Sequence, residues 1–209
     1  MGGLNRPPMP LASAAPPRAE ILWTGSLEDG AALARREDWS GLEGLERLWP
    51  RLARLHDERV ALEDTHASPP VRLTYRALGE AIERAAAAFS ALGAGQGDVV
   101  ALFGENSPRW LITDQGLMRA GAADAVRGGA APVEELRYIL QDSGAVGLVV
   151  ESAALFRALE LGPEPLARLR FVLCLEGAPA VRPDDGASLD WEGLTRLGET
   201  ASQIGRAHV

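Results

Sequence analysis

Residues 73–132 read LTYRALGEAIERAAAAFSALGAGQGDVVALFGENSPRWLITDQGLMRAGAADAVRGGAAP, and this stretch decides the fold. Apolar residues in its first part recur at alternating steps of four and three, which places them on one helix face: Leu78, Ile82, Ala85, Phe89 and Leu92. Glycines at 93, 95 and 97 end this helix, because glycine adopts the left-handed C-terminal conformation at little cost. Residues 99–103 (VVALF) then form a short apolar run typical of a buried strand.

A second helix and strand follow directly. Ser107 can cap the free amides of the helix, and Pro108 suits the first helical position, where its missing N–H has no partner to lose. The helix runs to Gly121, residues 123–126 form the next strand, and residues 127–129 form the loop after it. This order of elements with tight glycine turns predicts an α/β fold: a parallel or mixed sheet with helices on both faces.

The alternation of strands and helices continues on both sides of this stretch. Downstream, we expect a helix opened by Pro132 and closed at 143–144, followed by a strand at 146–150. A helix capped by Ser152 and ended by Gly162–Pro163 comes next, and then a strand at 171–175. A polar loop at 179–188 and a weak helix at 189–197 complete the series. Upstream, we expect a hairpin of strands 60–63 and 71–73, preceded by two short helices or one helix kinked at Pro50. Residues 1–20 are rich in Pro, Ala and Gly and are expected to be a disordered lead-in.

Composition excludes several classes of function. The chain has 209 residues, of which 46% are hydrophobic and 24% charged, an ordinary balance for one domain with one core. A net charge of −8 argues against nucleic acid as a partner, since phosphate binding needs a basic face. No apolar run approaches the roughly 20 residues that span a bilayer, and no signal sequence begins the chain, so we expect a cytoplasmic location. The single cysteine, Cys174, excludes a disulfide framework and is expected to be a small buried side chain.

The combined pattern resembles the N-terminal part of an acyl-adenylate-forming (AMP-binding) ligase. The features are LTY before a long helix, GD before VVALFGENSPRW, then RAGA, then APVEELRYILQDSGAVGLVVE, all within roughly residues 47–177. The loop at 126–129 (VRGG) lacks the proline of most members and is similar to long-chain fatty acid ligases of the cyanobacterial and plastid acyl-ACP synthetase type. The resemblance implies that residues 21–200 are an incomplete N-terminal portion of a larger adenylate-forming domain.

For such a longer ligase, the resemblance implies a two-step reaction. A fatty acid carboxylate attacks the α-phosphate of ATP with the help of Mg²⁺, and CoA or acyl carrier protein then takes the acyl group. The family's phosphate loop ending in Lys, its later nucleotide signatures and its C-terminal lysine do not occur in this chain, and residues 24–26 are a faint echo of the first. The resemblance therefore implies no catalytic residue and no metal ligand here, leaves cofactor-binding residues unknown, and predicts that this chain alone is inactive. Peripheral contact with a membrane stays open.

The last residues depart from the family pattern. Residues 203–209 read QIGRAHV, and IGRAHV is what a common sequencing-library adapter encodes when it is translated. We therefore expect residues 201–209 to be a non-native tail, with His208 inside it.

Two glycine loops could hold a phosphate. The loop at 93–97 (GAGQG) follows a helix and opens a strand, the reverse of a nucleotide fingerprint, so a turn is favoured. Gly128–Gly129 follows a strand at its carboxyl end, where ligands bind in open α/β sheets, but it lacks a lysine and a plain turn is again favoured. Arg127 beside it could bind a carboxylate or phosphate bidentately, and the alternative is a surface residue or an ion-pair partner.

The other polar residues favour structural roles. The three histidines show no metal-ligand spacing. Solvated positions are expected for two histidines and two acidic pairs: His56, His66, Glu134–Glu135 and Asp184–Asp185. Ser107 is expected to be a helix cap and not a nucleophile, and Trp110 is expected to belong to the core.

Two alternative functions stay open. The first is a free-standing, non-catalytic α/β scaffold or interaction module. Such a module should protect its edge strand with charges or prolines, whereas a truncated sheet exposes an apolar edge. We expect residues 171–175 (FVLCL) to be that edge, which favours truncation. The second is an adenylation domain for another carboxylic acid, which would share this region.

Overall fold

The computed structural model describes residues 41–67, 69–184 and 186–207. The chain divides into two units, Met1–Gly41 and Leu42–Val209, and the elements below belong to the second. The predicted lead-in at residues 1–20 lies outside the described residues.

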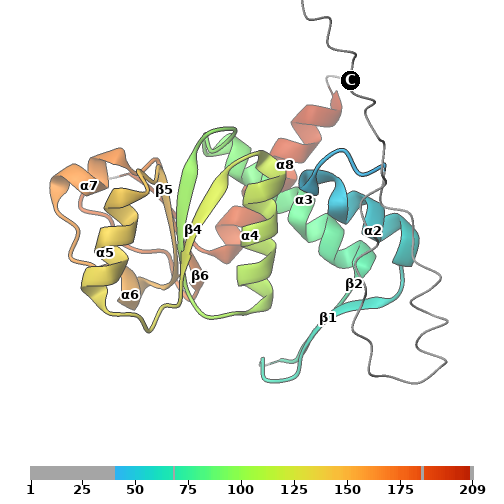
Figure 1. Cartoon of the computed structure of the whole chain (residues 1–209), viewed down its shortest axis with the longest axis horizontal. Coiled ribbons are helices and arrows are strands. Elements are labelled where there is room, and N and C mark those ends of the chain that lie inside the picture. Colours follow the sequence, from blue (N-terminus) through green and yellow to red (C-terminus); the bar gives the residue numbers. More distant parts are fainter. Residues whose placement is uncertain (1–40, 68, 185, 208–209) are drawn as a thin grey trace, which may run out of the picture. The chain divides into compact units, whose positions relative to one another are not determined.

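Five parallel strands form the main sheet, in the order β4-β3-β5-β6-β7 (Figure 1). Their bounds are β3 Val99–Phe103, β4 Ala123–Arg127, β5 Gly147–Ser152, β6 Phe171–Glu176 and β7 Ala187–Leu189. The predicted α/β fold is therefore confirmed, and all pairings within this sheet are parallel.

Helices cover both faces of the sheet, as predicted (Figure 1). One face packs against α3 Tyr75–Ala91, α4 Pro108–Ala120 and α8 Trp191–Ala207. The other packs against α5 Val133–Asp142, α6 Ala153–Ala158 and α7 Pro163–Arg168. Alternate residues of β3 serve the two cores: Val100 and Leu102 point to the first, and Ala101 and Phe103 to the second. This alternation explains why the strand reads as a continuous apolar run.

Local signals in the sequence placed three of the helix ends correctly. The Ser107 hydroxyl accepts a hydrogen bond from the Trp110 amide at 3.1 Å and begins α4. The Ser152 hydroxyl accepts one from the Leu155 amide at 3.3 Å and begins α6. Gly93 has a φ of +83°, the left-handed conformation predicted after α3.

The segment before α3 forms a helical pair and a hairpin. A 3₁₀ helix, η1 Leu45–Arg47, leads directly into α2 Leu48–His56. Pro50 lies in the first turn of α2, where no helical hydrogen bond is lost, so it neither kinks nor divides the helix. Strands β1 Val60–Asp64 and β2 Val71–Thr74 pair antiparallel, which confirms the predicted hairpin.

Three expectations about the C-terminal half were wrong. Gly162–Pro163 begins α7 and does not end α6, because Pro163 takes the first helical position after Gly162. Helix α8 extends well beyond the predicted 189–197. The short strand β7 within the supposed loop pairs with β6, so FVLCL is an interior strand and not an edge. The apolar-edge argument for truncation is therefore lost.

Gly198 gives a test of how α8 packs on α3. It is buried, and a Cβ built on it would overlap the backbone carbonyl of Arg84. In a free helix, glycine to alanine stabilises by about 0.5–1 kcal/mol. Here we expect Gly198→Ala to lower the free energy of unfolding by about 1–3 kcal/mol, because the helices must separate.

The measurement is urea unfolding of the 209-residue chain, with Gly193→Ala as the control in the same helix. A Cβ on Gly193 would meet side chains and no backbone: an oxygen of Asp190 at 3.1 Å, and two carbons of Leu189 at 3.6 and 3.7 Å. A Gly198→Ala variant as stable as the control would show that the close crossing is absent in solution.

Candidate functional site

A cleft of about 820 Å³ opens at the carboxyl ends of the parallel strands, where ligands bind in open α/β sheets. The loop of the β1–β2 hairpin lines one side, residues 105–109 line the second, and the ends of β5 and β6 line the third. A neighbouring pocket of about 590 Å³ shares Asn106 to Pro108 and adds the apolar side chains of Leu62, Trp110 and Leu111. We call the larger space the strand-end cleft.

The hairpin wall of the strand-end cleft is held by Asp64. Its Oδ1 accepts hydrogen bonds from the backbone amides of His66 at 2.9 Å and Ala67 at 3.1 Å. This local turn follows β1 directly and needs no distant partner. His66 is exposed on the cleft wall, as predicted for a solvated side chain.

The loop after β3 is fixed by its neighbours on both sides. The Gly104 amide donates to the Arg127 carbonyl at 3.1 Å, and the Glu105 amide donates to Oε2 of Glu151 at 3.2 Å. These bonds tie the ends of β3, β4 and β5 together. The Glu105 and Glu151 side chains consequently lie beside the loop that follows β4.

The two carboxylates decide the role of Gly128–Gly129. A Cβ on Gly128 would lie 3.0 Å from Oε1 of Glu105, and one on Gly129 would lie 3.1 Å from Oε2 of Glu151. A phosphate at this loop would meet negative charge. The loop also closes on itself, since the Ala131 amide donates to the Gly128 carbonyl at 3.1 Å. The structure therefore supports the plain turn and not the phosphate loop.

Arg127 is an ion-pair partner. Its Nε donates to Oε1 of Glu135 at 2.7 Å, and its Nη2 donates to Oε2 at 3.4 Å. The hydrogen bond with Glu135 and the charge of that residue raise the pKa of Arg127. The guanidinium is thus engaged by a neighbouring helix, and Glu135, which stays partly exposed as expected, is its ion-pair partner.

Arg109 links three elements at the edge of the strand-end cleft. Its Nη1 donates to the Leu175 carbonyl at the end of β6, and its guanidinium lies 5.6 Å from the ring centroid of Trp191 at the start of α8. The sequence did not single out this residue, because its partners lie far away along the chain.

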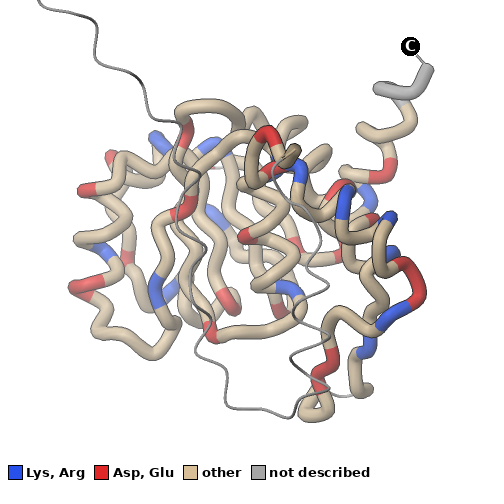
Figure 2. Tube along the Cα trace, turned by 45° about the vertical axis from the view of Figure 1, so that its right-hand side comes forward, with Lys and Arg blue, Asp and Glu red and all other residues tan. Residues whose placement is uncertain are grey.

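The strand-end cleft is acidic. Acidic and basic residues are interspersed along the trace of the described part (Figure 2). The residues that line the cleft, however, include Arg109 as a basic side chain and four acidic side chains: Asp64, Glu105, Glu151 and Glu176. Such a surface favours cationic or neutral groups over anions.

The other residues considered from the sequence lie away from the strand-end cleft. Residues 93–97 form a turn at the amino ends of the strands, where the Gly95 amide donates to Oδ2 of Asp98 at 3.0 Å. His56 is half-buried and packs on Tyr75, with ring centroids 5.0 Å apart, so the expectation of a solvated side chain was wrong. Trp110 is half-buried against the core of α3, α4 and α8, and Cys174 is fully buried, which raises the pKa of its thiol.

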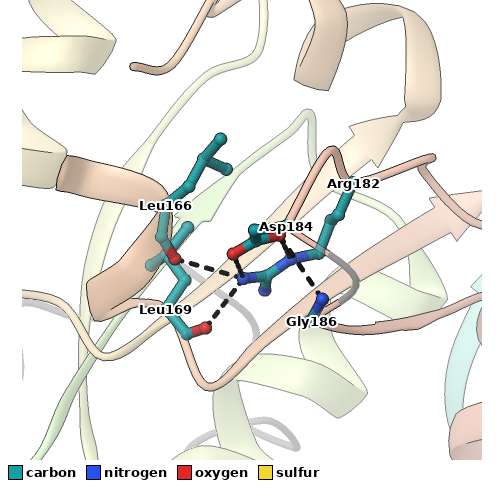
Figure 3. A network of polar contacts seen from close by, with 5 residues as sticks. All are labelled: Leu166, Leu169, Arg182, Asp184 and Gly186. Carbon is teal, nitrogen blue, oxygen red and sulfur yellow. Dashed lines mark hydrogen bonds and ion pairs between the residues drawn. The ribbon is translucent and has the colours of Figure 1, made fainter. Parts of the chain in front are cut away.

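Asp184 is bound to a buried arginine (Figure 3). Nε and Nη2 of Arg182 donate to Asp184 at 2.8 and 2.6 Å, and Nη2 also donates to the carbonyls of Leu166 at 3.1 Å and Leu169 at 3.0 Å. The hydrogen bond from Arg182 lowers the pKa of Asp184 to about 2. The expected solvated acidic pair is therefore wrong for Asp184, and Asp185 lies outside the described residues.

The described residues do not fit the ATP and Mg²⁺ that the resemblance implies. The better glycine loop faces carboxylates, and Arg127 is already paired. Within residues 41–67, 69–184 and 186–207, no three His, Cys, Asp or Glu side chains could hold a metal ion. In the same described part, no helix has the length and apolar character needed to cross a membrane. We derive no step through ATP or metal from these residues.

Comparison with known proteins identifies the family. Residues 49–196 match the family described as AMP-binding enzyme. The long-chain-fatty-acid–[acyl-carrier-protein] ligase AEE15 of Arabidopsis thaliana chloroplasts is 36% identical over 161 residues, covering 77% of this chain and 22% of that protein. A crotonobetaine/carnitine–CoA ligase of Salmonella paratyphi A is 34% identical over 157 residues, covering 73% and 29%.

Solved structures share the fold. The N-terminal domain of FACL13 from Mycobacterium tuberculosis superposes with a TM-score of 0.61 at 20% identity, over 76% of this chain and 36% of that one. The chain spans less than a third of the curated relatives named above. It belongs to the AMP-binding, adenylate-forming ligase family and corresponds to part of the family's N-terminal domain.

Proposed function

We propose that this chain is the N-terminal portion of a long-chain fatty acid ligase, which forms an acyl-adenylate from ATP and passes the acyl group to acyl carrier protein or CoA. The observation that carries the proposal is the 36% identity to a plastid fatty acid–acyl-carrier-protein ligase across 77% of the chain. A second plastid relative, probable acyl-activating enzyme 16 of Arabidopsis thaliana, is 35% identical over 152 residues. The VRGG sequence at 126–129 supports the same subgroup.

The 209-residue chain is expected to be a structural part of that ligase and not a catalyst by itself. The resemblance implies lysines at the ATP phosphates and at the reacting centre, and this chain has none, since all 21 of its basic residues are arginines. The acidic strand-end cleft offers no substitute for stabilising the charge that develops on a phosphate. The proposal assigns the chemistry to residues that follow residue 200 in a longer protein.

We predict that the pure 209-residue chain releases no pyrophosphate from ATP and palmitate above a heat-treated blank. The longer protein encoded at the source locus should release it with palmitate and not with carnitine, and should acylate holo-acyl carrier protein or CoA. The assay is enzyme-coupled pyrophosphate release, with hydroxylamine trapping of the acyl-adenylate. Turnover by the 209-residue chain would overturn its structural assignment.

A second candidate is a ligase for another carboxylic acid. The similarity to crotonobetaine/carnitine–CoA ligases, at 30–34% identity, favours it. Release of pyrophosphate by the longer protein with carnitine or an aryl acid, and not with palmitate, would select this candidate. A stop codon after Val209 at the source locus would instead make the non-catalytic scaffold the function to test.

A further inference from the structure

Two carboxyl groups meet between helix α4 and the edge strand β4. Asp124 is in register with Val100 of β3, so its side chain points to the sheet face that α4 covers. On that side it faces α4, and Asp114 on this helix is one of the groups that raise the pKa of Asp124. The Oδ2 atom of Asp124 is buried and has no hydrogen-bond partner within the described part of the chain.

The position of Asp114 is fixed from the other side. The Gln115 side-chain amide donates to Oδ2 of Asp114, and Nε1 of Trp49 donates to the Gln115 carbonyl oxygen at 2.6 Å. An indole nitrogen only donates, so Trp49 orients the amide with its NH₂ group toward Asp114. Asp114 is therefore held as a hydrogen-bond acceptor.

The unpartnered oxygen of Asp124 is explained by a proton. Two ionised carboxylates are both acceptors and cannot bond each other, whereas one protonated carboxyl donates to the other. Since Asp114 already accepts from Gln115, the proton belongs on Asp124. Burial, with the hydrogen bond and charge of Asp114, raises the pKa of Asp124 to about 7.

Several other charged groups on the surrounding elements pair with one another, and Arg109 on α4 donates to the Leu175 carbonyl. Strand β3 has none. Arg119 on α4 pairs with Glu83 on α3 at 2.7 Å, and Arg47 pairs with Glu46 within η1 at 3.7 Å. Arg127 on β4 pairs with Glu135 on α5 at 2.7 Å. Arg127 is in register with Phe103, so it points to the opposite face of the sheet from Asp124. These pairings leave a proton as the simplest neutralising partner for Asp124.

We propose that Asp114 and Asp124 form a proton-dependent contact that joins α4 to the edge strand β4 when one carboxyl is protonated and loosens when both are ionised. The first turn of α4 lines the strand-end cleft, and β4 ends at the Gly128–Gly129 loop beside Glu105. A change in the contact between α4 and β4 thus reaches the wall of the strand-end cleft. This inference concerns the fold and does not depend on the proposed function.

The test is urea unfolding of the 209-residue chain between pH 5 and pH 8.5. An aspartate in the unfolded chain loses its proton near pH 4, so the native state holds the extra proton between about pH 4 and 7. The stability that this extra proton contributes is therefore fully present below pH 4 and is lost as the pH rises through 7. We expect the folded-to-unfolded ratio to fall about tenfold to a hundredfold, less than the full pKa shift allows because the pair is partly exposed.

Asp124→Asn keeps the shape and supplies a permanent donor, so its stability should stay flat over this pH range. The control Glu134→Gln removes an exposed carboxylate on α5 and should keep the wild-type slope. The protection factors of the β4 amides, which correct for the intrinsic rise of exchange with pH, should fall with pH in the wild type and not in Asp124→Asn. An equal pH slope in Asp124→Asn and the wild type would overturn the proposal.

If Asp124→Asn does not fold, the wild type decides the matter by carbon NMR of its aspartate carboxyls. A carboxyl of the pair that titrates near pH 7 supports the proposal. Ordinary titration of both Asp114 and Asp124 below pH 5 contradicts it.

Discussion

Arg182→Met is expected to lower the free energy of unfolding by about 2–4 kcal/mol. The Arg182 side chain is only 2% exposed and ties the end of α7 to the loop before β7 (Figure 3). Methionine fills most of the volume, but it removes the donor of the Leu169 carbonyl and one of the two donors of the Leu166 carbonyl, which also accepts from the Leu169 amide. Buried carbonyls that lose their partner carry the desolvation cost in full, which is why the expected loss exceeds that of an ordinary ion pair.

The matched control is Arg168→Met. Arg168 pairs with Glu164 at 2.5 Å, but its side chain is 60% exposed, so the expected loss is below about 0.5 kcal/mol. Gly186→Ala is a second variant on the same contact, because a Cβ there would overlap the Arg182 guanidinium. Equal, small losses in all three variants would show that Arg182 is not buried in solution.

Acid unfolding gives the same contact a distinct signature. Arg182 holds the pKa of Asp184 at about 2, below the ordinary value near 4. The stability that comes from the lowered pKa of Asp184 is present above pH 4 and is lost as the pH falls through 2. The wild type should therefore lose stability over this interval more steeply than Arg182→Met, in which Asp184 titrates in its ordinary range.

The fold could be predicted where the signal is local. Helix α3 shows its buried face through spacing, and Ser107 and Ser152 mark helix starts by chemistry that acts three residues away. Strand β7 has only three residues and exists because β6 offers a pairing partner, which no local pattern reveals. The sequence Gly162–Pro163 can end one helix or begin another. The structure shows that it begins α7, because α6 has already ended before the irregular segment that precedes Gly162.

The candidate site was predictable in part. Glu105, Glu151 and Glu176 all follow or end predicted strands, so the rule that ligands bind at strand carboxyl ends could have grouped them. The hairpin wall could not be placed this way, because it lies outside the main sheet. The burial of Arg182 depends on carbonyls 13 and 16 residues upstream, so the acidic residues near it looked solvated.

Phe171→Ala is expected to lower the free energy of unfolding by about 3–5 kcal/mol. Phe171 is fully buried and stands opposite Gly147 in the β5–β6 register. Its ring covers the space over that glycine, since a Cβ on Gly147 would overlap three ring carbons. The ring also packs on Phe89, with centroids 5.9 Å apart, so it joins the sheet to α3.

The control for Phe171→Ala is Tyr138→Ala, an aromatic that is 63% exposed on α5, for which we expect a change within about 0.5 kcal/mol. A double mutant separates the pairing of ring and glycine from simple loss of volume. Gly147→Ala alone should destabilise, because its methyl group displaces the ring. In the Phe171→Ala background the same methyl group enters the vacated space, so Gly147→Ala should be neutral or stabilising. Additive losses would mean that the ring and Gly147 do not occupy one shared space, and the close pairing of β5 and β6 at this position would then need another cause.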